Sequence, residues 1–136
     1  MTQMAFIHFP VRDLAKSTAF YEILGFQKNA QWSDDNVSSI VISDTIVIQL
    51  LTEAFFNQMG QANGLSIAPA GSVSAAHAFS RESREAVDTL IDAATAGGGE
   101  VIGDPMDEGF MYSRSIRDLD GHVLDFLYVD QTAVPG

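Results

Sequence analysis

The same order of predicted elements occurs twice along this chain of 136 residues. Each copy begins with an alternating strand, continues with an amphipathic helix and ends with short strands that include a hairpin. The first copy has its strand, helix and hairpin at residues 6–11, 14–24 and 37–51. The second has its strand, helix, short strand and hairpin at residues 75–80, 84–96, 101–102 and 111–129. A repeat on this scale fixes the architecture, and it predicts an α+β protein.

Capping residues and glycines mark the ends of both predicted helices. Asp13 precedes the first helix and Gly25 ends it, while Ser83 precedes the second and the glycines at 97–99 end it. The second helix places apolar residues on one face, namely Val87, Leu90, Ile91 and Ala94. Pro10 marks the first strand as an edge strand or a strand end, because proline cannot donate to a sheet.

The length suits one domain with a substantial core. We expect a single domain over residues 1–136, built of two halves at about 4–60 and 73–130. Residues 52–59 are typical of a short helical or lid-like segment. Residues 61–74 are rich in Gly, Ala, Ser and Pro, which indicates a connection between the halves.

The charge and composition of the chain limit the classes of partner that we expect it to bind. Seven basic against eighteen acidic residues give a formal net charge of −11, and such a field repels polyanions, so we expect no nucleic-acid partner. No apolar run approaches the ~20 residues of a membrane span, and the first residues do not have the pattern of a signal peptide. We therefore expect a cytoplasmic protein with no membrane partner. The chain has no cysteine, which excludes disulfides, thiolate nucleophiles and cysteine metal sites.

Two segments carry a family resemblance. The late one is the acidic turn at 118–122, which leads directly into an alternating strand at 123–129. The early one joins a strand to a helix that ends at a glycine, through Pro10, Val11, Asp13, Leu14, Ser17, Phe20, Tyr21, Leu24, Gly25 and Phe26. Together they resemble the vicinal-oxygen-chelate superfamily, which includes glyoxalase I, ring-cleaving extradiol dioxygenases, and fosfomycin- and bleomycin-resistance proteins. Residues 41–44, 50–56, 109–115 and 118–122 also look like a bacterial group of lactoylglutathione-lyase-related proteins.

The resemblance implies two βαβββ modules that form a curved mixed sheet around a cleft. It also implies four inward positions that hold a divalent metal in the superfamily, usually through His, Gln or Glu. Counted from the helix and turn motifs, these positions are Phe6, Gln49, Ala76 and Asp125. Phenylalanine and alanine cannot bind a metal, and one amide with one carboxylate makes a weak site for a transition metal. We therefore expect no cofactor and no tightly bound divalent metal.

A two-histidine, one-carboxylate triad of His8, His77 and Asp125 is the alternative metal site. Its spacing argues against it. His8 keeps the face of Phe6 but lies about 7 Å further along the strand, whereas His77 follows Ala76 and points to the opposite face. The weak ligand candidates that remain are His8, Gln49 and Asp125.

Several side chains have two open interpretations. His8 could be a general base or a ligand contact, because histidine gains and loses a proton near neutral pH, or it could be a half-buried structural residue. Gln49 and Asp125 could bind a polar ligand or could hydrogen-bond across strands. Phe55, Phe56, Met59 and Trp32 could cover an apolar cavity or could be ordinary core residues. The predicted ligand-binding set is Phe6, His8, Gln49, Ala76 and Asp125.

Three functions follow from these observations. The first is a small-molecule-binding glyoxalase- or dioxygenase-like protein with a degraded metal site. The second is a metal-dependent lyase or dioxygenase of the glyoxalase type, and the third is an antibiotic-binding resistance protein. Catalysis is undecided at this stage. We expect a homodimer, because the repeat leaves sheet edges and apolar faces that one short chain can hardly cover.

Overall fold

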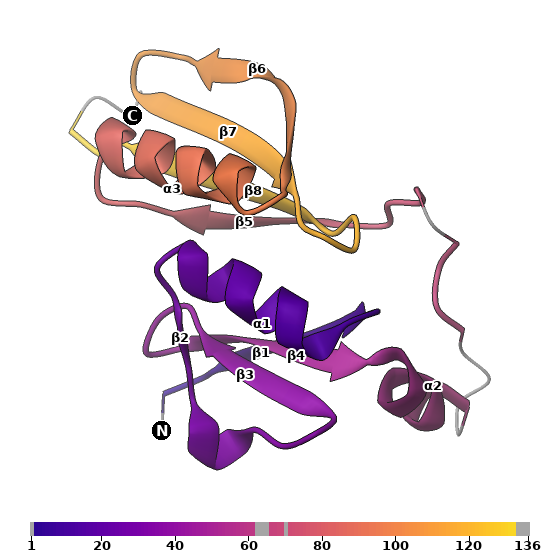
Figure 1. Ribbon diagram of the computed structural model, residues 1–136. Coiled ribbons are helices and arrows are strands. Elements are labelled where there is room, and N and C mark those ends of the chain that lie inside the picture. Colours follow the sequence, from indigo (N-terminus) through magenta and orange to yellow (C-terminus); the bar gives the residue numbers. More distant parts are fainter. Residues whose placement is uncertain (1, 62–65, 70, 133–136) are drawn as a thin grey trace. The chain divides into compact units, whose positions relative to one another are not determined.

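The computed structural model describes residues 2–61, 66–69 and 71–132. The chain divides into two compact units, residues 1–72 and 73–136, and each contains one four-stranded sheet. Figure 1 shows the helix of each repeat lying over its own sheet. The fold is α+β, and each unit has the order strand, helix and three strands, which confirms the prediction of two βαβββ modules.

The first unit contains four strands, two α-helices and a short 3-10 helix among its described residues. In chain order they are β1 (Ala5–Val11), α1 (Leu14–Ile23), β2 (Gln27–Lys28), η1 (Ala30–Trp32), β3 (Val37–Val41), β4 (Ile46–Thr52) and α2 (Glu53–Gln61). The sheet order is β1-β4-β3-β2, with β1 parallel to β4 and the other pairs antiparallel. Pro10 therefore lies on an edge strand, as its missing N–H requires.

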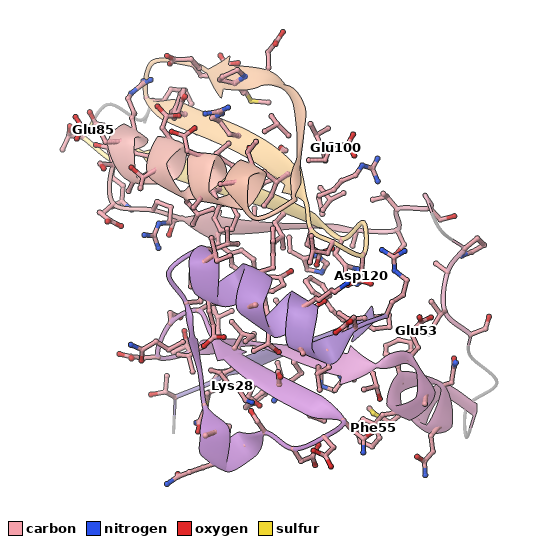
Figure 2. The ribbon with its side chains drawn as sticks, in the orientation of Figure 1. Lys28, Glu53, Phe55, Glu85, Glu100 and Asp120 are labelled. Carbon is pink, nitrogen blue, oxygen red and sulfur yellow. The ribbon has the colours of Figure 1, made fainter. Side chains whose placement is uncertain are left out.

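The structure confirms the residues predicted to begin and end the helices of the first unit. Asp13 caps α1 by accepting a hydrogen bond from the Lys16 backbone N–H at 3.0 Å. Gly25 follows with φ of 101°, a conformation that glycine adopts without strain. The hydroxyl of Thr52 accepts from the Phe55 N–H at 3.2 Å and so caps α2, which carries Glu53 and Phe55 in its first turn (Figure 2).

The second unit repeats this arrangement with β5 (Ala76–Ser80), α3 (Arg84–Ala96), β6 (Glu100–Asp107), β7 (Met111–Arg117) and β8 (Val123–Val129). Its sheet order is β5-β8-β7-β6, and β5 is parallel to β8. Ser83 caps α3 by accepting a hydrogen bond from Ala86 N–H. The negative charge of Glu85 in the first turn interacts favourably with the positive end of the helix dipole. The four predicted apolar residues of α3 are all buried.

One strand is longer than the sequence predicts. Residues 101–102 were expected to form a short strand, but β6 runs from Glu100 to Asp107. The register shifts between Ile102 and Met106, so an irregularity accommodates Gly103 and Pro105 inside the strand. Gly103 and Pro105 are typical of a turn, so the sequence does not indicate that the strand continues through them.

Each unit has its own buried core between helix and sheet. In the first unit the core contains Phe9, Val11, Phe20, Tyr21, Leu24, Ile40, Ile48 and Leu50. In the second it contains Phe79, Val87, Leu90, Ile91, Ala94, Ile116, Leu124 and Phe126. Within the described residues, no helix is long and apolar enough to cross a membrane.

Candidate functional site

Each sheet has one face against its helix and a second face pointing away from it, which we call the outer face. In the first unit, the hydroxyl groups of Thr18 on α1 and Ser38 on β3 lie 2.7 Å apart, so Ser38 belongs to the helix face. Alternation along the strands then places Ser39 on the outer face. The strand register puts His8 and Gln49 on that face as well, because His8 is opposite Gln49 and Gln49 is opposite Ser39.

The outer face of the first unit therefore carries a polar row across three strands, His8 on β1, Gln49 on β4 and Ser39 on β3. The Ser39 hydroxyl lies 2.8 Å from Gln49 Oε1 and 2.6 Å from the carbonyl oxygen of Trp32. Ser39 is fully buried, Gln49 is half-buried and His8 is exposed. The row thus runs from a buried anchor to an accessible imidazole.

An aromatic pair lies on the same outer face. Phe6 is opposite Val47, two residues before His8 on the same side of β1, and its ring centroid is 6.2 Å from that of Trp32 in η1. Phe6 is 45 % exposed and Trp32 is 52 % exposed. The interpretation of Trp32 as an ordinary core residue is therefore wrong, and so is that of Met59, which is 40 % exposed, because both side chains reach solvent. Phe55 and Phe56 are half-buried.

The second unit has an equivalent row on its outer face. Asp125 on β8 is opposite Ala78 on β5 and Ser115 on β7. The Ser115 hydroxyl donates to Asp125 Oδ1 at 2.5 Å. Ala78 occupies the place that His8 has in the first row, and Ala76 lies two residues before it, opposite Val123. The serine–polar pair is therefore present in both repeats, whereas the histidine is present in one.

These residues do not fit a transition-metal centre. Of the four positions implied by the superfamily resemblance, Phe6 and Ala76 offer no donor atom, and Gln49 and Asp125 each already contact a serine hydroxyl. Within the residues that the structure describes, no group of three or more His, Asp or Glu side chains could hold a metal ion. The absence of a tightly bound metal stays a prediction.

The remaining histidines lie elsewhere. His77 is opposite Leu124, on the face that packs against α3, and so does not share the face of Asp125. His122 precedes β8 in the acidic turn, where its backbone N–H donates to Asp118 Oδ1 at 2.9 Å. Asp118 is 6 % exposed and also accepts from the Asp120 N–H at 2.9 Å. The acidic motif that carries much of the family resemblance is therefore a structural turn.

Sequence reasoning missed a cluster on the helix side of the second unit. The Tyr112 hydroxyl and the Arg114 guanidinium donate to the same oxygen of Asp88 on α3, at 2.6 and 3.0 Å. The tyrosine hydroxyl, and after it the arginine, hold the pKa of Asp88 below its ordinary value of 3.8, and Asp88 in turn raises the pKa of Tyr112. Nearby, Arg84 lies over the Tyr112 ring and pairs with Asp107 at 2.7 Å. The cluster ties α3 to β7, and only the register of the folded sheet reveals it.

Comparison with known proteins agrees with the fold and the turn motif. The model of the Glyoxalase/Bleomycin resistance protein/Dioxygenase superfamily matches residues 3–126, and the chain belongs to this superfamily. A comparison with curated proteins found no match.

Several solved structures are similar to the chain over most of their length. One is a hypothetical protein of S. aureus, SA1046, at 27% identity and a TM-score of 0.79, with 94% of this chain and 95% of that one covered. Another is a glyoxalase/bleomycin resistance protein/dioxygenase family enzyme from Burkholderia phytofirmans PsJN, at 20% identity, a TM-score of 0.79, and 94% and 99% coverage. A glyoxalase-related enzyme from Fulvimarina pelagi has 18% identity, a TM-score of 0.74, and 94% and 88% coverage. The last two likenesses establish the fold alone.

Proposed function

We propose that this superfamily member binds a small molecule through its outer-face residues and does so without a transition metal. The observation that carries the proposal is the residue set at the four positions that hold a metal in the superfamily. Two of them, Phe6 and Ala76, have no donor atom. The other two, Gln49 and Asp125, each contact a serine on a neighbouring strand. A ligand would therefore meet protein groups directly.

The proposed polar contacts are His8 and Gln49 in the first unit and Asp125 in the second. Phe6 supplies an exposed apolar contact two residues before His8 on β1, and Ala76 is opposite Val123 on β8. Specific binding to such groups depends on partners that replace their hydrogen bonds to water. If the protein is catalytic, His8 is the candidate general base, because it is the accessible titratable group of its row.

Two narrower functions stay as alternatives. A metal-dependent lyase or dioxygenase would recruit His8, Gln49 and Asp125 as ligands. An antibiotic-binding resistance protein would need no metal, and the net charge of −11 favours cationic ligands. We also propose that the protein is cytoplasmic and that it forms a homodimer.

Metal content of the purified protein separates the first alternative from the proposal. The protein would be dialysed, analysed for its elements and titrated with zinc and nickel in a calorimeter. We expect no stoichiometric metal and no tight binding. A stoichiometric metal that is lost on Asp125→Ala would replace the proposal by the metal-dependent alternative.

A ligand screen by thermal shift tests the assigned contacts. For a ligand found in this way, His8→Ala or Gln49→Ala should weaken binding by about 1–3 kcal/mol, the cost of leaving a buried partner group unpaired. His77→Ala is the matched control, because His77 lies on the α3 side of its sheet. If His77→Ala abolishes binding while His8→Ala does not, the assignment of the site is wrong.

A further inference from the structure

The hydroxyl of Ser39 has more acceptors beside it than it has hydrogens. It lies 2.6 Å from the carbonyl oxygen of Trp32 and 2.8 Å from Gln49 Oε1, and both contacts are within hydrogen-bond distance. A serine hydroxyl carries one hydrogen. It can donate to one of these oxygens, and the other would then face the lone pairs of Ser39 Oγ at close range.

Turning the amide of Gln49 by half a turn about its last side-chain bond resolves this conflict. The nitrogen Nε2 then takes the place beside Ser39 and donates to its hydroxyl oxygen, while Ser39 donates to the Trp32 carbonyl. A buried polar group that loses its partner costs about 1–3 kcal/mol. Because Ser39 is fully buried, the arrangement that satisfies both contacts is strongly favoured.

We infer that Gln49 donates to Ser39 through Nε2 and presents its amide oxygen outward, so that the ligand of this face must donate a hydrogen bond to it. The outward amide atom has no hydrogen-bond partner among the residues that the structure describes. Gln49 is half-buried, so a ligand can reach this atom. The family resemblance predicts a metal that would accept oxygen atoms of a substrate. Here the corresponding protein group is itself an acceptor and selects N–H or O–H groups.

The surroundings of Gln49 narrow the ligand to a small, flat organic cation. The exposed rings of Phe6 and Trp32 lie on the same face and favour a flat cationic body. The strand residues of this face include no Lys or Arg, since Lys28 is opposite Ile40 and belongs to the helix face. Residues 1–72 also carry six acidic against three basic side chains, which favours a positive ligand.

The inference is confined to the first unit and rests on the proposed function. In the second unit Asp125 is also an acceptor, but Arg117 lies on the same outer face, opposite Val123. A cation would meet a like charge there. The class of ligand is therefore read from His8, Gln49, Phe6 and Trp32 alone.

The amide orientation is testable without any ligand. In nuclear Overhauser spectra of the whole protein, the side-chain NH2 protons of Gln49 should show contacts to the β protons of Ser39. Contacts of that NH2 group to other residues, with none to Ser39, would place the oxygen beside Ser39 and overturn the inference.

The ligand class is tested with two flat probes of similar shape and opposite character, benzamidinium, which donates, and benzoate, which accepts. We expect benzamidinium to shift the amide resonances of Phe6, Trp32 and Gln49, and to bind about tenfold more weakly to Gln49→Met, the equivalent of one hydrogen bond. Gln58→Met on α2 is the matched control and should leave binding unchanged. Benzoate should not shift these resonances.

The outcomes separate the inference from the proposed function. Equal or stronger binding of benzoate would overturn the ligand class. If neither probe binds but other small molecules shift the same resonances, the inference fails and the proposed function stands. If no small molecule of a broad screen affects these residues, both fail.

Discussion

Asp118 should be among the most important polar residues for stability, although it lies outside the proposed ligand contacts. Its Oδ1 atom accepts two backbone hydrogen bonds across the turn, from Asp120 and His122, both at 2.9 Å. Its own backbone closes the same turn, because Asp118 N–H donates to the His122 carbonyl at 2.9 Å. The turn aligns β7 with β8, the strand pair that carries Ser115 and Asp125. Replacing Asp118 by alanine should therefore loosen the central strand pair of the second sheet.

The expected loss in the free energy of unfolding follows from the two backbone hydrogen bonds that Asp118 Oδ1 accepts. A hydrogen bond to a charged group contributes about 1.5–3 kcal/mol, and a neutral one about 0.5–1.5 kcal/mol. Water can replace part of the loss, because the turn is only partly buried. We expect Asp118→Ala to lower the free energy of unfolding by about 2–4 kcal/mol. Asp118→Asn keeps an oxygen that can accept both bonds but removes the charge, so it should cost about half as much.

Urea denaturation of the two variants and the wild type, followed by circular dichroism, measures these differences. A typical domain has about 5–15 kcal/mol of stability, so both variants should remain folded in buffer. The order of the two variants is the decisive result. If alanine and asparagine cost the same, or if neither costs more than about 0.5 kcal/mol, the account of the turn as a pair of charge-assisted bonds is wrong.

Three further predictions concern acid, glycine and assembly. The pKa of Asp107 is lowered from 3.8 to about 2, mainly by hydrogen bonds from Arg84 and from the Gly109 N–H. The stability that Asp107 contributes should therefore be present above pH 3.8 and lost as the pH falls toward 2, so the difference between wild type and Asp107→Asn in urea denaturation should shrink over that window. Gly98→Ala should lower the free energy of unfolding in urea by about 1–2 kcal/mol, because Gly98 has φ of 99° and an added Cβ would lie 3.3 Å from Leu119 Cδ2. The same change should cost less in a Leu119→Ala background, and an equal cost in both backgrounds would contradict the role of this contact. The protein should sediment as a dimer, and a monomer at high micromolar concentration would contradict the proposed assembly.

The repeat, the caps and the hairpins could be predicted because each depends on local chemistry. Asp13 and Ser83 form their caps, and the buried face of α3 is the one that its apolar spacing indicates. Two strands were not predicted correctly, also for local reasons. The short strand β2 has two residues and leaves no periodic signal, and β6 passes through Gly103 and Pro105, which indicate a turn. The assignment of 1–136 as a single domain stays a prediction, and residues 62–65 of the predicted connection lie outside the described residues.

The candidate site was predictable only in part. Alternation indicated that His8, Gln49 and Asp125 leave the helix faces of their sheets, and the register agrees with this. Alternation could not identify the hydrogen-bond partners of Gln49 and Asp125. These partners, Ser39 and Ser115, come from strands whose pairing depends on the whole module. The exposure of Trp32 escaped for a similar reason. Tryptophan side chains are highly buried on average, whereas here the ring of Trp32 in η1 packs beside Phe6 and is 52 % exposed.

The parallel pairing in each module has a consequence for synthesis on the ribosome. β1 is an edge strand whose sole partner in its sheet is β4, the last strand of its module, and β5 depends in the same way on β8. A nascent chain therefore carries β1 without a partner until β4 has been translated and has left the exit tunnel. Long-range pairings of this kind form slowly, and a strand is prone to aggregation until it has paired. A pause in translation while β1 is outside the tunnel and β4 is still inside it should therefore be more harmful to this protein than a pause after β4 has emerged, when the first module can close.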